Sequence, residues 1–520
     1  MWRKWNRNLQ KSMSSVNRIL LNTIVTYLRT LFAAVVGLFT ARWVLLSLGE
    51  DSYGLYGLVG SILVFITFLN NVLAGSVSRF FAYSIGQQDS ALLNKWFNAS
   101  IRIHIVIPIL LIIIGGLIGT YAIKFLLNVD VNDESVALKV FYISLLASAV
   151  TMMASPFKGL LLAKQDIAQQ SIIEILQSLV HLLLMYLLTK IKHDQLIVYA
   201  IMMAAETIIF QILIALRACT LYNDISFLKY PWIKLKVYVK ELLVFSSWKS
   251  LMGFGQIFFN QGLAILLNVF FGTRLNAAYS VSSNVSAQSS TVSNSLMMAI
   301  TPEIITRKGA GKHEDMKSLA LKAGKYSSYL VLFISLPLFI DIDNILLLWL
   351  KEPPMYTNEL CRFILVSLFV EKLASGQESA INACGRIKEF QISIGCSYIV
   401  SIIIAYILLR IFDYPDVIGW AFLICATLNT GIRLHYGQSV ADIRITDWLK
   451  HVFLPLLFVT SVVSMLSGFI ELFLPDDGLL RLLLLVSITT ILFAINGWFF
   501  ILDSTIKNTI LSKIFKKHED

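Results

Sequence analysis

The sequence has few charges and few residues that perform enzyme chemistry. Only 14% of its 520 residues are charged, and seven are histidine. It has no histidine pair at metal-ligand spacing, no nucleotide-binding glycine loop and no Gly-x-Ser-x-Gly elbow. Its five cysteines lie in or beside apolar runs, without the spacing of metal or disulfide sites. We therefore expect no enzyme activity, no catalytic residues, no metal and no cofactor.

Long apolar stretches dominate the sequence instead. Hydrophobic residues make up 57% of the chain, and the mean hydropathy is +0.73. A helix of about 20 apolar residues crosses the hydrocarbon core of a bilayer. The sequence therefore predicts an all-α polytopic membrane protein. Fourteen transmembrane helices are expected, at residues 17–48, 53–84, 102–127, 137–160, 167–189, 195–217, 242–271, 275–305, 326–349, 355–383, 389–411, 416–441, 451–474 and 479–502.

The basic residues orient these helices. Most of the 43 Lys and Arg residues fall in the two chain ends and in the loops of one side, whereas the short loops of the other side are acidic. Because positive loops remain in the cytoplasm, we expect both termini to be cytoplasmic. The net charge of +11 then reflects orientation and not nucleic-acid binding. Residues 1–18 are too basic and polar for a cleavable signal peptide.

Two halves of similar order are visible in the chain. One constant offset relates Gly49 to Gly272 and Tyr56 to Tyr279. We expect two pseudo-symmetric six-helix bundles, a central cavity and two extra C-terminal helices. The predicted boundaries are a basic tail at 1–16, the N-terminal bundle at 17–221, an amphipathic cytoplasmic linker at 222–241, the C-terminal bundle at 242–443, two additional helices at 444–502 and a basic tail at 503–520. The linker mixes aromatic, aliphatic and lysine residues, which is typical of a helix on an anionic membrane surface.

The segment 276–301 is rich in Ser, Thr, Asn and Gln and has no charge, yet it is long enough to cross a bilayer. An apolar stripe from Ala278 to Leu296 occupies one sector of its helical wheel. Polar groups in hydrocarbon need partners, so we expect the polar sides, including Asn284 and Gln288, to face a water-filled cavity. The alternative is a Ser-rich linker.

Six basic residues lie inside the predicted spans: Arg29, Arg42, Arg79, Lys249, Lys372 and Arg433. Charges at that depth face a bundle interior, a partner or a cavity, or reach an interface from a helix end. Arg29 is deep, and Asn22 shares its helix face, which suits an anionic group such as a phosphate. The alternative is a structural ion pair with Glu174 or Glu206.

Other predicted spans contain polar stripes. Ser144, Ser148, Thr151 and Ser155 repeat at helical spacing, and we interpret them as helix-packing contacts. Glu371 and Glu378 share a face in the span 355–383. They are candidate counter-ions to Lys372 or Arg433, or coupling groups for protons or sodium. The sequence leaves these alternatives open.

Two stretches resemble a known family. The first, RILLNTIVTYLRTLFAAVVGLFTARWVLLSLGEDSYGLYGLVGSI, contains an LG-x-x-x-YGLY element at Leu48–Tyr56. The second is the polar span 276–301, which continues into MMAITPEI and is similar to the eighth helix of the same family. Together they resemble the Wzx-type polysaccharide flippases of the MATE-like multidrug/oligosaccharidyl-lipid/polysaccharide exporter superfamily.

This resemblance implies two six-helix bundles that alternate access to a central cavity in a bacterial inner membrane. It implies an oligosaccharide on undecaprenyl diphosphate as substrate, with a polysaccharide polymerase and other assembly proteins as partners. Arg29 lies at a position similar to that of a cavity cation in the first helix of this family. The eighth span lacks the arginine of lipid II flippases. The first and seventh spans lack the coupling carboxylate usual in MATE exporters.

The hypothesis is a flippase for lipid-linked O-antigen, capsule or exopolysaccharide repeat units. The diphosphate is expected near Arg29 and Asn22, helped by Lys249 or Arg433, and the sugars near Asn284 and Gln288. Coupling or counter-ion candidates are Glu174, Glu206, Glu371 and Glu378. One rival is a MATE-like cation-coupled small-molecule antiporter. Another is a membrane glycan polymerase or ligase, although no predicted outer loop has the size that such enzymes use.

Overall fold

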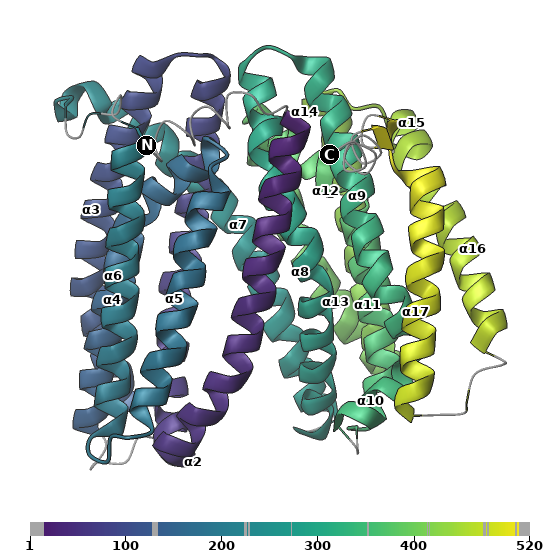
Figure 1. Cartoon of the computed structure of the whole chain (residues 1–520), viewed down its shortest axis with the longest axis horizontal. Coiled ribbons are helices and arrows are strands. Elements are labelled where there is room, and N and C mark those ends of the chain that lie inside the picture. Colours follow the sequence, from purple (N-terminus) through teal and green to yellow (C-terminus); the bar gives the residue numbers. More distant parts are fainter. Residues whose placement is uncertain are drawn as a thin grey trace, which may run out of the picture. The chain divides into compact units, whose positions relative to one another are not determined.

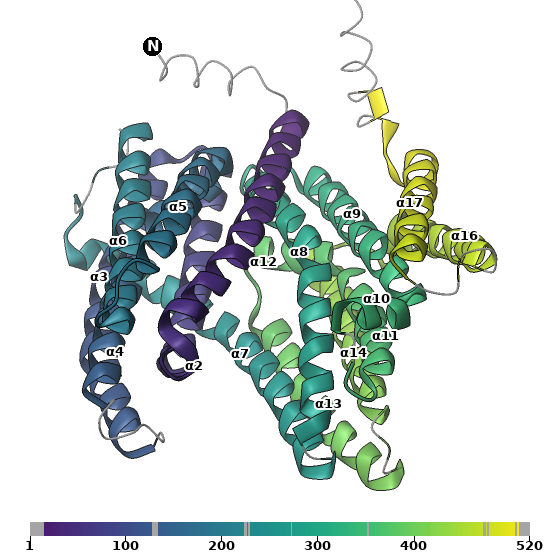
Figure 2. The same cartoon turned by 60° about the horizontal axis from the view of Figure 1, so that its bottom comes forward.

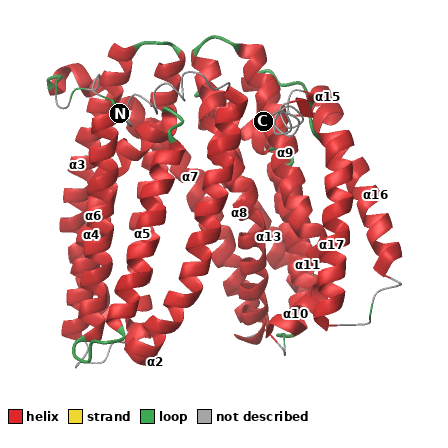
Figure 3. Cartoon of the chain, in the orientation of Figure 1, coloured by secondary structure: helices red, strands yellow, loops and turns green. Residues whose placement is uncertain are grey.

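The structure is a computed structural model that describes residues 15–126, 134–222, 226, 229–271, 273–350, 353–412, 414, 416–471, 475, 478–504 and 507–508. Every regular element in these ranges is helical (Figure 3). Ten of the helices are long and apolar enough to cross a membrane. The prediction of an all-helical, multi-pass membrane protein is confirmed, while the count of 14 and the pseudo-symmetry stay predictions.

The chain divides into two compact units. The first comprises Met1–Ser247 and Gly309–Gly311, and the second Trp248–Lys308 and Lys312–Asp520. The predicted tails lie largely outside the described residues. The predicted linker 222–241 is described only in part, and its end forms the start of helix α7 (Trp232–Phe271). This helix begins in the first unit and continues into the second.

The first unit is a helical bundle (Figure 1). Within it, α4 packs against α3, α2 and α6, and α5 packs against α2 and α6. Its elements are α2 (Ser15–Gly86), α3 (Ser90–Tyr121), the π-helical turn η1 (Ala122–Leu126), α4 (Glu134–Ala163), α5 (Ile167–Leu188), α6 (Gln195–Leu221) and the beginning of α7.

A break at Gly49 divides α2. This residue has φ 74° and ψ 169°, whereas the residues around it are helical. Positive φ is accessible to glycine because it has no Cβ. The break falls between the predicted spans 17–48 and 53–84, so the two spans form one element with a kink.

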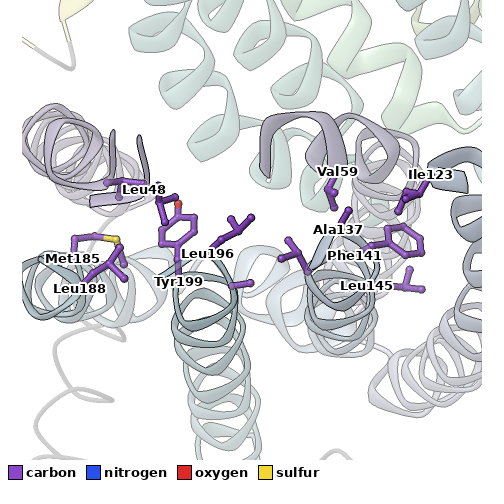
Figure 4. Packing of buried hydrophobic residues seen from close by; sticks show 13 residues of the cluster. Leu48, Val59, Ile123, Ala137, Phe141, Leu145, Met185, Leu188, Leu196 and Tyr199 are labelled. Carbon is purple, nitrogen blue, oxygen red and sulfur yellow. The ribbon is translucent and has the colours of Figure 1, made fainter. Parts of the chain in front are cut away.

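The interior of the first unit is closely packed (Figure 4). Phe141, Leu145, Val59 and Tyr199 belong to one cluster of buried residues from α2, α4 and α6. Gly119 of α3 lies against the Phe141 ring, and a Cβ at this position would come within 2.1 Å of it. Helices in lipid associate through such van der Waals packing of small against large residues.

The second unit contains the rest of the chain, seen from a second side in Figure 2. Within it, α14 packs against α11, α12 and α13, while α16 and α17 pack against each other and against α9. Its elements are the remainder of α7, α8 (Thr273–Gly309), α9 (His313–Ile340), α10 (Ile342–Leu350), α11 (Thr357–Lys372), α12 (Ser375–Cys384), α13 (Lys388–Phe412), α14 (Val417–Ala441), α15 (Ile445–Trp448), η2 (Leu449–Phe453), α16 (Leu454–Glu471), α17 (Gly478–Asn496) and η3 (Gly497–Ile501).

The predicted single helix 355–383 is broken into α11 and α12. At the break, Trp448 Nε1 donates to the Leu373 carbonyl at 2.8 Å, which supplies that carbonyl with a partner outside the helix. Gly376 lies so close to α9 that a Cβ there would be 1.9 Å from the Ala320 carbonyl oxygen. The break therefore coincides with two contacts: Gly376 closely approaches α9, and Trp448 from a distant part of the chain binds the Leu373 carbonyl.

Candidate functional site

The second unit contains a cavity of about 870 Å³. Its walls come from α7, α8, α11, α13 and α14. Binding sites for small ligands have volumes of about 300–1,000 Å³, so the cavity is large enough for a ligand of several rings.

Helix α8 supplies the most polar wall. Ser283, Asn284, Ser290 and Asn294 line the cavity on one side of the helix. On its other side Val281 and Val285 pack against buried residues of α10 and α11, as the apolar stripe predicts. Hydroxyl groups on the packed side bond to neighbouring helices: Ser293 with Ser327 at 2.6 Å, and Thr301 with Ser379 at 3.1 Å. The hydroxyl and amide groups on the cavity side offer hydrogen-bond donors and acceptors to a ligand or water.

Aromatic rings form another part of the wall. Tyr279 and Phe422 stack with their centroids 6.0 Å apart and an angle of 25° between the rings. Phe259 meets Phe422 edge-on at 5.5 Å and lies 5.7 Å from Tyr398. All four residues line the cavity. The combination of flat apolar faces with amides and hydroxyls matches a sugar ring, which has apolar C–H faces and polar edges.

A charged cluster lies at one side of this cavity. Arg433 donates to Glu378 at 2.9 Å and to Glu371 at 3.2 Å, and only 3% of its side chain is exposed. Lys372 Nζ donates to the Asn294 side-chain oxygen at 2.7 Å. Glu371 and Lys372 line the cavity. Two cations and two carboxylates make the cluster neutral, which lowers the cost of burying it.

The first unit has a separate pocket of about 460 Å³. Arg29 is paired there with Glu174, which also accepts a bond of 2.8 Å from Gln170. Another carboxylate, that of Glu206, is 5% exposed and lies 2.9 Å from His181 Nδ1. Arg29 is 22% exposed, so its guanidinium reaches the pocket while it holds the carboxylate. The described residues contain no cluster that could hold a metal ion.

Comparison with solved structures decides the architecture. A multidrug resistance MATE family transporter of the MOP superfamily in an outward-facing conformation is similar, with 14% identity, a TM-score of 0.71, and coverage of 83% of this chain and 97% of that chain. A MATE transporter from Vibrio cholerae is also similar, with 13% identity and a TM-score of 0.70. The match covers 84% of this chain and 99% of that chain. The chain has the MATE transporter fold. A MOP superfamily transporter from Pyrococcus furiosus with a binding pocket of reverse polarity is also similar, at 14% identity, TM-score 0.67, and coverage of 83% and 96%.

Sequence comparison gives no further match. No protein-family model matches it, and no curated protein matches it by sequence. At 13–14% identity, the structural similarity establishes the fold and leaves the substrate to be argued from the site.

The predicted site residues fall into separate groups on this fold. Arg29, Glu174 and Glu206 share the pocket of the first unit. Asn284 and Glu371 share the cavity of the second, and Arg433 and Glu378 adjoin it.

Three other predicted residues lie outside these two sites. Asn22 is 2% exposed and donates to the Gln165 carbonyl at 3.0 Å, so it holds the turn between α4 and α5. Gln288 is exposed but does not line the cavity, and Lys249 is half-buried on α7. The side chain of Arg42 lies outside the described residues. Arg79 stacks on the rings of Phe80 and Phe245 at 4.7 Å each.

Lys158 was not among the predicted site residues. It falls in α4, near enough to Glu174 and Arg29 to interact with both charges, and is half-buried. The sequence places it at the end of a predicted span, where a lysine is assigned to the adjoining loop. Its spacing from Ser155 and Thr151 on the polar stripe of α4 is the signal that could have found it.

The polar stripe of α4 was interpreted as helix-packing contacts, but three of its four residues line a cavity. Ser144, Ser148 and Thr151 line a third cavity, of about 270 Å³, in the first unit. Ser148 and Thr151 donate to backbone carbonyls of their own helix at 2.9 Å each. Of the four, Ser155 does contact another helix, because it donates to Asn70 of α2 at 2.7 Å.

Proposed function

We propose that the chain is a flippase for undecaprenyl-diphosphate-linked oligosaccharides. Its substrates are repeat units of O-antigen, capsule or exopolysaccharide, and its membrane is a bacterial inner membrane with both termini in the cytoplasm. Transport proceeds by alternating access, as in other transporters built from repeated bundles. The polymerase that joins such repeat units is the partner expected to receive the product.

The cavity of the second unit is the observation that supports this substrate class. Amides and hydroxyls of α8 and the aromatic pair Tyr279 and Phe422 give it both kinds of contact that sugar rings make. Its charged cluster is neutral and already internally paired. A cavity for a cationic drug needs carboxylates without a cation partner, whereas both carboxylates here bond to Arg433.

The diphosphate is assigned to Arg29 in the first unit. Arg29 is paired with Glu174, and Lys158 lies near both. A phosphate would replace the carboxylate as the guanidinium's partner, since arginine binds both groups in the same bidentate manner. Arg433 is enclosed by its two carboxylates and is assigned a structural role instead.

The test of the sugar contact uses two amides of α8. Asn284 lines the cavity and Gln288 is exposed outside it. In a host strain lacking its own copy of the gene, Asn284→Leu should fail to restore surface polysaccharide, and Gln288→Leu should restore it. Both variants should reach wild-type amounts in the membrane. Normal polysaccharide with Asn284→Leu would contradict the assignment of this cavity to sugars.

The test of the diphosphate contact changes Glu174. Glu174→Gln removes the carboxylate that competes for Arg29, so binding of undecaprenyl diphosphate to the purified chain should become several-fold tighter. Arg29→Gln should weaken it by tenfold or more, since a charge-assisted bond contributes about 1.5–3 kcal/mol. Unchanged affinity in both variants would remove the diphosphate from this pocket without affecting the sugar assignment.

A MATE-like cation-coupled antiporter is the second candidate. It is favoured by the fold and by Glu206, a buried carboxylate with a histidine neighbour that could exchange a proton. This candidate predicts drug resistance when the chain is overexpressed in a sensitive host, and loss of that resistance with Glu206→Gln. A flippase predicts no change in drug resistance.

A further inference from the structure

The segment just before α7 is held against α3 by two asparagines. Asn94 Oδ1 accepts from the Ser226 backbone N–H at 2.9 Å, and Asn98 Nδ2 donates to the Ser226 carbonyl at 2.8 Å. Asn98 Oδ1 also accepts from the backbone N–H of Lys229 at 3.0 Å. These bonds satisfy the backbone of the segment just before α7, and they fix where the helix begins.

The inner face of the first turns of α7 is apolar and buried. Leu235, Val239 and Leu242 follow at helical spacing and are at most 9% exposed. Between them, Tyr238 meets Trp96 of α3 edge-on at 4.9 Å. One side of the helix is therefore fully used in packing.

The outer face has a different composition. Ile233, Lys236, Val237 and Lys240 occupy positions i, i+3, i+4 and i+7, so they lie within about 100° of the helix circumference. All four are exposed, Ile233 by 85% and Val237 by 70%. We call these four residues the lysine face. One carboxylate, Glu241, is exposed at its edge.

Two neighbouring helices place this face at the border of the bilayer. Helix α7 has 40 residues, about 60 Å, whereas the hydrocarbon core is about 30 Å thick. Its predicted span, 242–271, is long enough to cross that core, and the turns that contain Lys236 and Lys240 precede this span. On α3, Arg102 is the last charged residue before the uncharged stretch 103–121, and its guanidinium lies 5.5 Å over the Trp232 ring. Tryptophan is enriched at this level of a membrane.

We infer that the lysine face binds the headgroups of anionic phospholipids. Ile233 and Val237 enter the layer between headgroup and acyl chain, and Lys236 and Lys240 extend along it to the phosphates. Two exposed ammonium groups without a carboxylate between them attract a negative surface. The two aliphatic side chains favour lipid over an acidic protein, because lipid removes them from water without a complementary pocket.

The experiment measures bound lipid on the purified full chain by native mass spectrometry. Phosphatidylglycerol and phosphatidylcholine are offered in equal amounts. The wild type should prefer phosphatidylglycerol, and raising the salt to about 0.5 M should reduce that preference through screening. The variant Lys236→Gln/Lys240→Gln should bind phosphatidylglycerol about fivefold more weakly for each lysine removed, with unchanged binding of phosphatidylcholine.

The matched control is Lys308→Gln/Lys312→Gln, which removes the same charge elsewhere on the chain. It should keep the preference for phosphatidylglycerol, and both double variants should unfold at the wild-type temperature in phosphatidylcholine micelles. The inference is overturned if the lysine-face variant keeps the preference, if the control loses it equally, or if salt has no effect on the wild type. Binding of polyglutamate at these lysines without a lipid preference would also overturn it, in favour of an acidic protein.

Discussion

Replacing Arg433 tests how the charged cluster beside the large cavity is held. Arg433→Met keeps most of the side-chain volume but removes two charge-assisted bonds, at 2.9 Å to Glu378 and 3.2 Å to Glu371. Removing one member of a buried ion pair costs about 3–5 kcal/mol. The side chains of Glu371 and Glu378 are 32% and 26% exposed, so water partly compensates them. We therefore expect a loss near the lower limit, about 3 kcal/mol, or roughly a hundredfold in the folded-to-unfolded ratio.

Chemical denaturation in detergent micelles, followed by tryptophan fluorescence, measures this loss. Adding Glu371→Gln and Glu378→Gln to Arg433→Met removes the carboxylates left without their partner, so it should restore about half of the lost stability. Arg444→Met is the control, because Arg444 is exposed and its partner Asp447 lies three residues away on the surface. A free energy of unfolding for Arg433→Met within about 0.5 kcal/mol of wild type would refute a structural role for this cluster.

Two further predictions concern packing and pH. Gly376→Ala should destabilise the chain by about 1–3 kcal/mol, because the new methyl group meets the Ala320 carbonyl at 1.9 Å. Gly431→Ala in α14, which has open space around it, should be neutral or stabilise by up to about 1 kcal/mol in the same thermal unfolding assay. For Asp503, burial would raise the pKa, but hydrogen bonds from two lysines of α9 outweigh burial and hold the pKa below its usual value. The stability that this carboxylate contributes is present above about pH 3.9 and is lost as the pH falls through its folded pKa. Wild type should therefore unfold at a higher temperature than Asp503→Asn at pH 6, and the difference should shrink as the pH falls below about 3.9; a constant difference would contradict this pH dependence.

Hydropathy and periodicity were sufficient to predict the local features of this chain. The long apolar helices, the break near Gly49 and the packing of the stripe of 276–301 are all encoded in residues close together in sequence. The polarity of α8 was informative because a bilayer tolerates hydroxyl and amide groups only where they find partners. Asn284 could therefore be selected as a cavity residue before any contact was known.

Features that depend on distant residues were not predictable in this way. The break between α11 and α12 coincides with a close approach of Gly376 to α9 and with Trp448 from a segment 75 residues away. Asn22 shares a helix face with Arg29, yet it bonds to the α4–α5 turn, 143 residues along the chain. Lys158 has the helical spacing of the polar stripe of α4, but its nearness to Arg29 and Glu174 depends on residues in α2 and α5.

The two arginine–glutamate clusters look alike in sequence but differ in their surroundings. Each was open to an ion-pair or a ligand-binding interpretation, and each arginine does have a carboxylate partner. Arg433 is 3% exposed and has two carboxylates, so an incoming anion would have to displace both from an enclosed site. Arg29 is 22% exposed, has one such partner and lies in a pocket of about 460 Å³ beside Lys158. Exchange of a carboxylate for a phosphate is therefore far less costly at Arg29, which is why we propose this arginine as the diphosphate contact.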